Sequence, residues 1–158
     1  MILVTLGTQD KQFSRLLEKL EQLKKQGIIS EEIIVQAGCT KFKSENMKII
    51  DMVPIDEFSK LIDSCELLIT HGGVGSIITG LRKNKKIIAV PRLKEYKEHE
   101  NNHQVQIIKK FSQKNYLLDG SELDKLELQY KKIKTQKFNK YKSDSKVKNI
   151  IENYIKNN

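Results

Sequence analysis

One stretch of the chain, residues 65–91, constrains the fold more than any other part of the sequence. It contains the apolar run 67–69, the glycine-rich turn 71–76, a helical pattern from about Ile77 and a second apolar run, 87–90. Short apolar runs on either side of a helix are typical of buried parallel strands. The stretch therefore predicts a βαβ unit, with ligand-binding loops at the carboxyl ends of its two strands.

The turn after the first of these strands has the composition of an anion-binding loop. Gly72, Gly73 and Gly75 leave backbone N–H groups uncovered at the electropositive start of a helix, which suits a phosphate or diphosphate. The dinucleotide pattern G-x-G-x-x-G would need a different spacing and an acidic residue after the following strand, where Arg92 and Lys94 stand instead. The Walker pattern would need a Gly-Lys-Ser/Thr ending, but Ser76 follows Gly75 directly and precedes Ile77. The alternative is that the glycines serve only a tight turn and strand–helix packing.

The remaining sequence continues the alternation of strands and helices. Strand-like runs cover residues 2–6, 33–38, 47–52 and 116–118, and helical patterns cover residues 13–27, 55–64, a segment from Val105 and residues 122–129. The first run ends in Gly7-Thr8, which predicts a second loop at the ligand-binding edge. Residues 92–102 are almost wholly polar and predict a long, mobile loop. The order predicts an α/β fold with a Rossmann-like parallel sheet.

Composition limits the classes of protein to which the chain belongs. Its 158 residues suffice for one domain, and its runs of apolar residues are too short for a membrane span or a signal peptide, which predicts a cytosolic protein. The net charge of +9 fits nucleic acid, an anionic membrane surface or simple solubility, but few aromatics and no nucleic-acid module disfavour the first. Cys39 and Cys65 lack metal-ligand spacing and are expected in the core.

The last part of the chain differs in composition from the rest. We predict a nucleotide-binding domain over residues 1–130 and, over residues 131–158, a basic linker followed by an amphipathic helix. In the tail, Val147, Ile150, Ile151 and Tyr154 form one apolar face. This face either packs back on the domain or docks on another chain.

Residues 99–103, His-Glu-Asn-Asn-His, match the zinc-binding pattern H-E-x-x-H. The flanking residues are charged, whereas a zinc-binding helix of this kind is buried among apolar residues, so we expect no metal site. In the alternative reading, His99, Asn102, His103 and Gln104 lie at a helix N-terminus that faces the glycine loop and bind a sugar or phosphate.

Taken together, several segments resemble the C-terminal, nucleotide-sugar-binding domain of the family-28 glycosyltransferases. The segments are residues 4–8, residues 51–54, His71-Gly72-Gly73-Val74-Gly75-Ser76, Val90-Pro91 and His103-Gln104. The resemblance extends roughly to Leu118 and is strongest to a split branch in which this half is a separate protein. That branch includes bacterial capsule and exopolysaccharide galactosyltransferases and the catalytic subunit of the dolichol-linked N-acetylglucosamine transferase.

The resemblance implies one half of a GT-B fold and a set of donor-binding residues. These are Gly7, Thr8, Met52, Val53, His71, Gly72, Gly73, Gly75, Ser76, Thr79, His99, His103 and Gln104. The glycines of the turn 71–76 and Ser76 would hold the donor diphosphate, and Gly7 and Thr8 would line the opposite side of the pocket. Residues 52–53 would lie by the uracil, and residues 103–104 would reach the sugar. Thr79 stands where several relatives carry a ribose-binding Glu, which leaves bidentate ribose recognition open. His71 is the candidate catalytic base, unless it only orients the loop.

The implied function is a UDP-sugar-dependent, inverting, metal-independent hexosyltransferase of capsular or exopolysaccharide synthesis. It would need no cofactor and would transfer galactose or N-acetylglucosamine to a lipid-diphosphate-linked sugar at the inner face of the cytoplasmic membrane. A membrane-anchored, acceptor-binding subunit is the expected partner, and nucleic acid is not. Two rivals remain, namely a non-catalytic UDP-sugar-binding regulatory subunit and a zinc hydrolase that uses residues 99–103.

Overall fold

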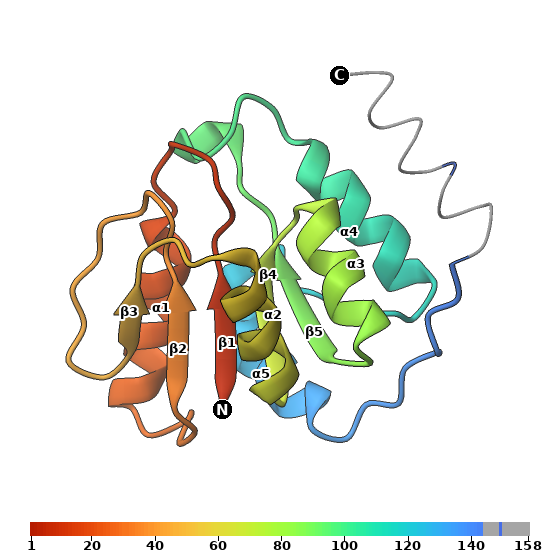
Figure 1. Ribbon diagram of the computed structural model, residues 1–158, viewed down its shortest axis with the longest axis horizontal. Coiled ribbons are helices and arrows are strands. Elements are labelled where there is room, and N and C mark those ends of the chain that lie inside the picture. Colours follow the sequence, from red (N-terminus) through yellow and green to blue (C-terminus); the bar gives the residue numbers. More distant parts are fainter. Residues whose placement is uncertain (144–148, 150–158) are drawn as a thin grey trace.

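The strands of the structure, a computed structural model that describes residues 1–143 and 149, run parallel in one sheet (Figure 1). They are β1 (Ile2–Thr5), β2 (Ile33–Gln36), β3 (Lys48–Ile50), β4 (Leu67–His71), β5 (Lys86–Val90) and β6 (Leu118–Asp119). Their order across the sheet is β3-β2-β1-β4-β5-β6. This order is that of a doubly wound Rossmann sheet, so the predicted fold class is confirmed.

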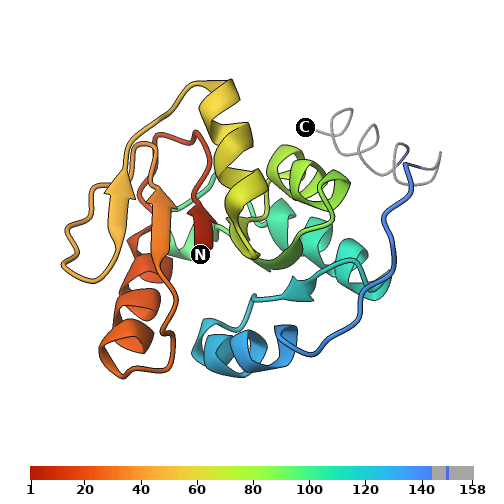
Figure 2. The same ribbon diagram turned by 60° about the horizontal axis from the view of Figure 1, so that its bottom comes forward.

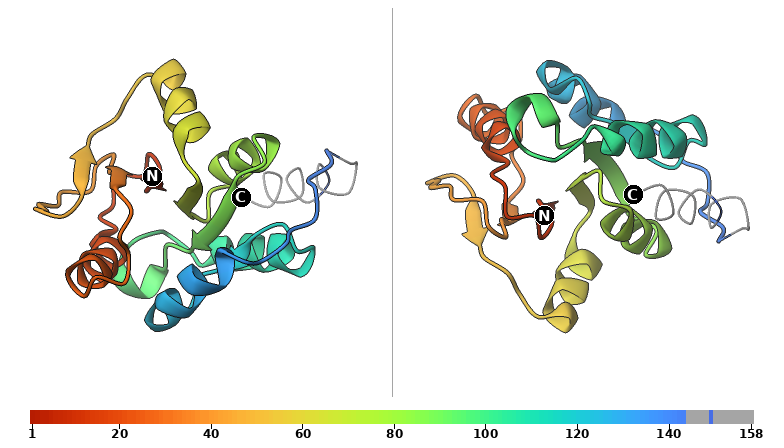
Figure 3. Two further views of the ribbon diagram at one scale, coloured as in Figure 1. Left: turned by 90° about the horizontal axis from the view of Figure 1, so that it is seen from below. Right: turned by 90° about the horizontal axis from the view of Figure 1, so that it is seen from above.

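Helices cover both faces of the sheet, as Figures 2 and 3 show from two further directions. The helices are α1 (Ser14–Lys25), α2 (Ile55–Ser64), α3 (Val74–Arg82), α4 (His103–Gln113) and α5 (Leu126–Ile133), with short 3₁₀ turns η1 (Lys94–Tyr96) and η2 (Leu123–Lys125). Helices α1 and α5 lie on one face, and α2 and α3 lie on the other. Helix α4 lies beside the β5–β6 end of the sheet.

Two hydrophobic clusters hold these layers together. Val4, Ile69 and Ile88 share the cluster on the side of α1 and α5, whereas Leu3 and Leu68 belong to the cluster that α3 covers. Neighbouring residues along a strand therefore point into different clusters, as the alternation of side chains in a strand requires. Because both faces of the central strands are buried, their sequences read as continuous apolar runs rather than as an alternating pattern.

The start of α3 differs from the prediction. The helix begins at Val74 and not at Ile77, so Gly75 and Ser76 belong to its first turn. Gly73 stands before the helix in an extended conformation, with φ −73° and ψ 126°. The glycine-rich turn is therefore shorter than expected, and the N-terminus of α3 follows almost directly on the end of β4.

The segment after β5 also differs from the prediction. It is not the mobile loop that its polar sequence suggested, because Arg92 is 0% exposed and Glu98 is 3% exposed. The turn η1 lies within it, and α4 starts at His103 rather than at Val105. Two buried, hydrogen-bonded charges hold the segment against the domain. The prediction failed because composition does not show that these charges find partners far away in the sequence.

A second correction concerns the cysteines. Cys65, between α2 and β4, is buried as expected, but Cys39 is exposed and does not belong to the core. Cys39 follows Gly38, which adopts a left-handed conformation with φ +58° after the end of β2. The chain turns there, and Cys39 belongs to neither hydrophobic cluster.

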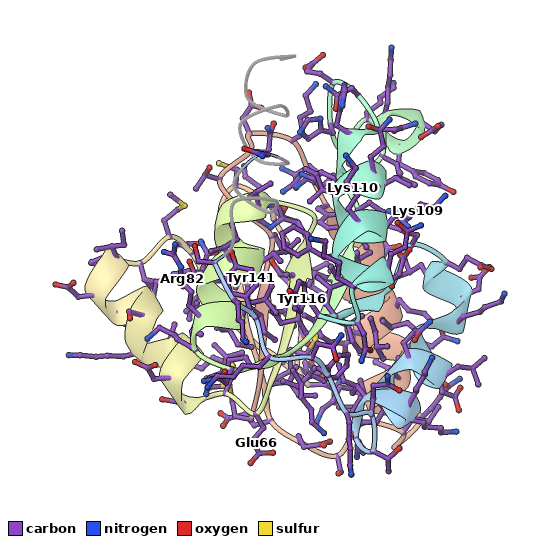
Figure 4. All side chains as sticks on the ribbon, turned by 90° about the vertical axis from the view of Figure 1, so that its right-hand side faces the viewer. Glu66, Arg82, Lys109, Lys110, Tyr116 and Tyr141 are labelled. Atoms are coloured by element: carbon purple, nitrogen blue, oxygen red, sulfur yellow. The ribbon has the colours of Figure 1, made fainter. Side chains whose placement is uncertain are left out.

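Residues 131–143 pack against the domain and do not form the predicted basic linker. Ile133, at the end of α5, is buried, and Phe138 packs on the first cluster. Tyr141 packs on the second cluster and meets Tyr116 edge to face, with ring centroids 5.5 Å apart (Figure 4). The predicted tail helix over residues 147–155 lies outside the described residues, except for Asn149. The functional division at residue 130 stays a prediction.

Candidate functional site

The candidate site lies where the order of the strands reverses. Strands β1 and β4 are neighbours in the sheet, but the chain leaves their carboxyl ends toward opposite faces, to α1 and to α3. The loops that separate there begin at Gly7 and at Gly72. In open α/β sheets this switch point is the usual ligand-binding crevice. The view from above in Figure 3 looks onto this edge.

The imidazole of His71 lies between two of the predicted glycines. A Cβ built on Gly7 would lie 2.5 Å from His71 Nε2, and one built on Gly73 would lie 2.2 Å from the same atom. No real Cβ approaches another atom so closely. Both glycines are therefore needed to make room for this ring, and Gly7 in addition has a left-handed backbone, with φ +79°. The three residues form one packed unit at the switch point.

Burial decides the charge of His71. Desolvation, and after it the nearby charge of Arg92, lower the pKa of His71 to about 4, although a hydrogen bond with the Thr5 backbone opposes both. Thr5 Oγ1 donates to Thr70 Oγ1 over 2.8 Å, and Thr70 Oγ1 lies 3.4 Å from His71 Nδ1. The ring is thus neutral at pH 7. A group with this pKa is a weak general base at neutral pH, but it is well placed to order the loop.

The N-terminus of α3 is open to a ligand. Among the described residues, a Cβ on Gly75 would meet no atom within 4 Å and no side chain caps the helix, and the first turn of the helix contains no acidic residue. The N–H groups of residues 74–76 have no partner within the helix, as at every helix start. Together with the helix dipole they make an electropositive surface that fits an anion. Thr79, one turn further on, donates its hydroxyl to the Gly75 carbonyl over 2.7 Å.

Gly72 has a packing role that differs from that of Gly75. A Cβ on Gly72 would lie 2.6 Å from Gln104 Cβ, so a side chain there would collide with α4. Gln104 Oε1 accepts hydrogen bonds from the N–H of Gly72 (3.0 Å) and from the N–H of Arg92 (2.9 Å). Gln104 is 4% exposed. Its amide oxygen thus joins the loops after β4 and β5, whereas the resemblance implied that Gln104 reaches the donor sugar.

The histidines of the zinc-like pattern do not share a helix. Helix α4 begins at His103, and His99 precedes it, where its Nδ1 accepts a hydrogen bond from the N–H of Asn101 over 3.3 Å. The arrangement that H-E-x-x-H requires, one helical turn between the two imidazoles, is therefore not formed. Burial, and after it the charge of Arg92, lowers the pKa of His99. Within the described residues there is no group of three or more His, Cys, Asp or Glu side chains that could hold a metal ion.

The predicted uracil-binding residues lie on the other side of the switch point, after β3. Met52 is 57% exposed, and its Sδ lies 3.6 Å from Gln36 Nε2. Val53 beside it is half-buried. The Met52 sulfur also lies 3.9 Å from the position of a Cβ on Gly38. Met52 thus borders the loop after β2, and Thr8 lies exposed at the loop after β1.

Two residues of this region were missed in the sequence. Gly38 touches the site, because a Cβ on it would lie 2.5 Å from the carbonyl oxygen of Gly7. Its signal was a glycine directly after a strand. Arg92 is the other, and its fully buried guanidinium donates to the carbonyl of Leu6, immediately before Gly7. The sequence gives only a weak signal for Arg92, a charged residue directly after a buried strand and Pro91.

Comparisons with known proteins agree with this geometry. Over 81 residues the chain is 32% identical to the UDP-N-acetylglucosamine transferase subunit ALG13 of Candida albicans, a match that covers 51% of this chain and 26% of that protein. In fold it resembles the spinosyn forosaminyltransferase SpnP, with a TM-score of 0.61 and 15% identity over 84% of this chain and 34% of that chain.

It also resembles the glycosyltransferase SnogD from Streptomyces nogalater, with a TM-score of 0.52 and 19% identity over 75% of this chain and 30% of that chain. The chain thus spans between 26% and 34% of the length of these proteins, about a quarter to a third. Residues 1–157 match the family described as "Glycosyltransferase family 28 C-terminal domain". The chain therefore belongs to the family-28 glycosyltransferases as their C-terminal domain, one half of a GT-B fold.

Proposed function

We propose that this chain is the donor-binding subunit of a UDP-sugar-dependent glycosyltransferase. The observation that carries the proposal is the open N-terminus of α3 at the switch point, with Gly75 facing free space beside the packed His71 and its two glycines. An uncapped helix start without acidic residues suits the diphosphate of a nucleotide sugar. The family and the relative named as a UDP-N-acetylglucosamine transferase subunit support UDP as the nucleotide.

In this proposal the chain supplies the leaving-group half of the reaction. As the bond between sugar and diphosphate breaks, negative charge develops on UDP, and the N–H groups at the start of α3 stabilise it. Gly7 and Thr8 line the opposite side of the pocket, Met52 and Val53 lie by the uracil, and His99 and His103 lie toward the sugar. Ser76 and Thr79 contribute hydroxyl groups along the first turns of α3. The reaction is inverting and needs neither a metal nor a cofactor.

The catalytic base is better sought on another chain than at His71. Its pKa of about 4 leaves the His71 imidazole neutral but only weakly basic at pH 7. We propose that His71 orders the glycine loop and that a membrane-anchored partner supplies the acceptor site and the base. Within the described residues, no helix is long and apolar enough to cross a membrane. The partner would hold this chain at the inner face of the cytoplasmic membrane, beside a lipid-diphosphate-linked acceptor of capsular or exopolysaccharide synthesis.

The transferred sugar in this proposal is a hexose, either galactose or N-acetylglucosamine. The relative named as an N-acetylglucosamine transferase subunit supports the second, and the resemblance to bacterial exopolysaccharide enzymes supports the first. Competition between UDP-galactose and UDP-N-acetylglucosamine for the purified chain ranks the two. Equal affinity for both would place the choice of sugar on the partner.

Calorimetry with UDP tests the proposal directly. The full chain should bind UDP, and Gly75→Val should abolish binding, because a branched side chain would fill the open space at the helix start. Gly75→Ala is the matched control, since it adds one methyl group in the same place and favours the helix. A folded Gly75→Val protein that binds UDP as tightly as the original would overturn the assigned site, and an original chain that does not bind UDP would overturn the function.

A further inference from the structure

Arg92 is the largest side chain that the structure buries completely. Its guanidinium donates to the Leu6 carbonyl through both Nε (3.1 Å) and Nη2 (2.6 Å). Nη1 donates to the carbonyls of Lys11 (2.8 Å) and Glu98 (3.2 Å). The Cζ atom of the guanidinium lies over the ring of Phe13, 5.0 Å from its centre. One side chain after β5 thus fixes the backbone at two points after β1, Leu6 and Lys11.

The charge of Arg92 is not matched by a carboxylate at hydrogen-bonding distance in the described contacts. The Glu98 side chain bonds instead to Arg15, through Nε (2.9 Å) and Nη2 (3.0 Å), and to the N–H of Leu93 (2.9 Å). Burial lowers the pKa of Arg92, and the charge of Glu98 only opposes this. A buried charge held mainly by carbonyl groups is costly, and an apolar residue would fill the space at lower cost. We therefore expect the buried charge of Arg92 to have a functional role.

The position of Arg92 connects it with both sides of the candidate site. Leu6, which receives two of its hydrogen bonds, directly precedes Gly7. The backbone N–H of Arg92 shares the Gln104 amide oxygen with the N–H of Gly72. The charge of Arg92 also reaches the ring between the two glycine loops, because it contributes to the lowered pKa of His71. Arg92 therefore combines a mechanical and an electrostatic connection to the place where a diphosphate would bind.

We propose that Arg92 is a positioning residue for the donor diphosphate, which holds the turn at Gly7 and presents a buried positive charge to the ligand without touching it. The inference rests on the proposed function. Its charge needs no reorganisation when the ligand arrives, because hydrogen bonds to three backbone carbonyl groups already fix the guanidinium. A fixed cation in a water-excluded position favours a dianionic or trianionic ligand over a neutral one.

The test compares UDP with uridine, which carries no phosphate, on the full chain. In Arg92→Met we expect the affinity for UDP to fall at least about tenfold, and the affinity for uridine to change by less than about threefold. Arg92→Lys keeps the charge but loses the planar fork, so it should retain part of the preference for UDP. A purely structural role would instead lower the affinities for UDP and uridine to a similar degree.

Arg15→Met is the matched control. It removes an arginine from the same network and leaves the Glu98 carboxylate without that partner, but it keeps the hydrogen bonds from Arg92 to Leu6. It should destabilise the fold while the ratio of UDP to uridine affinity stays unchanged. Thermal unfolding of each variant shows whether it is folded at the temperature of the titration. If Arg92→Met does not fold, the ratio of UDP to uridine affinity in Arg92→Lys tests the proposal.

The outcomes distinguish the role of Arg92 from the proposed function on which it rests. Binding of UDP to the original chain, with an unchanged ratio of UDP to uridine affinity in the Arg92 variants, would overturn the role of Arg92 and leave the proposed function standing. An equal loss of both affinities in Arg92→Lys would also overturn it. Failure of the original chain to bind UDP would overturn the proposed function itself.

Discussion

The imidazole of His71 occupies the space that a side chain on Gly73 would need, since a Cβ there would lie 2.2 Å from Nε2. The same atom excludes a side chain on Gly7, at 2.5 Å. Gly7 and Gly73, which are 66 residues apart in the sequence, therefore both pack against one buried ring. The two glycines at the switch point thus leave room for this ring, in addition to any role in binding a ligand.

We expect Gly73→Ala to lower the free energy of unfolding by about 1–3 kcal/mol, because the new methyl group must displace the His71 ring. His71→Ala in the same chain should recover part of this loss by removing the ring. Urea denaturation of the two single variants and the double variant gives the coupling free energy between the two positions. Strictly additive effects would contradict the packing seen here.

Gly75→Ala controls for the effect of the methyl group alone. It lies two residues further on, in the first turn of α3, and its Cβ would meet no atom within 4 Å. We expect the free energy of unfolding to stay the same or to rise by up to about 1 kcal/mol, since alanine favours a helix over glycine. A loss as large as that of Gly73→Ala would show that the whole turn, and not the His71 ring, limits substitution.

Stability should fall as the pH drops from about 6.5 toward about 4. The folded protein holds the pKa of His71 at about 4, chiefly by burial, whereas the unfolded chain has its usual value of 6.5. Between these values the unfolded state binds more protons, so protonation favours unfolding. The loss amounts to at most about 3 kcal/mol. Urea denaturation at several pH values should show it, and His71→Gln should flatten the pH dependence in this window.

The carboxyl group of Glu31 sets a separate window at lower pH. Burial raises the pKa of Glu31, but hydrogen bonds from Tyr130 and Lys134 outweigh it and bring the pKa to about 2. Its contribution to stability is therefore present above pH 4.5 and lost as the pH falls toward about 2. Glu31→Gln should change the pH dependence only below pH 4.5. An effect of this variant between pH 6.5 and 4.5 would show that the two windows had been assigned to the wrong groups.

Tyr141→Ala tests whether residues 131–143 belong to the folded domain. Tyr141 packs on the second hydrophobic cluster and meets Tyr116 edge to face, so its loss should lower the free energy of unfolding by about 1–2 kcal/mol. Lys142→Ala, at the exposed neighbouring position, should leave it unchanged within about 0.5 kcal/mol. Equal melting temperatures for both variants and the original chain would restore the linker interpretation.

Elemental analysis of protein prepared without chelator should find far less than one zinc ion per chain. His99 and His103 do not share a helical turn, because α4 begins at His103. Neither side chain therefore has the geometry that the zinc pattern needs. Zinc in stoichiometric amount that is lost when His103 is replaced by Ala would support the hydrolase alternative instead.

Local patterns in the sequence determined the sheet and the place of the site. The apolar runs, the helical spacing of Leu16, Leu20 and Leu23, and the glycines after β1 and β4 depend on residues close together in the chain. Alternating strands and helices allow few arrangements other than a doubly wound parallel sheet, whose switch point is then given by the connections. The exact start of α3 did not follow from these patterns, because glycine and serine occur both in turns and in first helical turns.

Only the tertiary structure decided what the polar residues around the site do. Arg92 bonds to Leu6, 86 positions away, and Gln104 bonds to Gly72, 32 positions away. A polar sequence reads as a mobile loop until such partners are known, because the same charges would otherwise stay in water. The neutral state of His71 likewise depends on burial and on the charge of Arg92. Contacts and desolvation of this kind arise only when distant segments meet, so no local pattern in the sequence could reveal them.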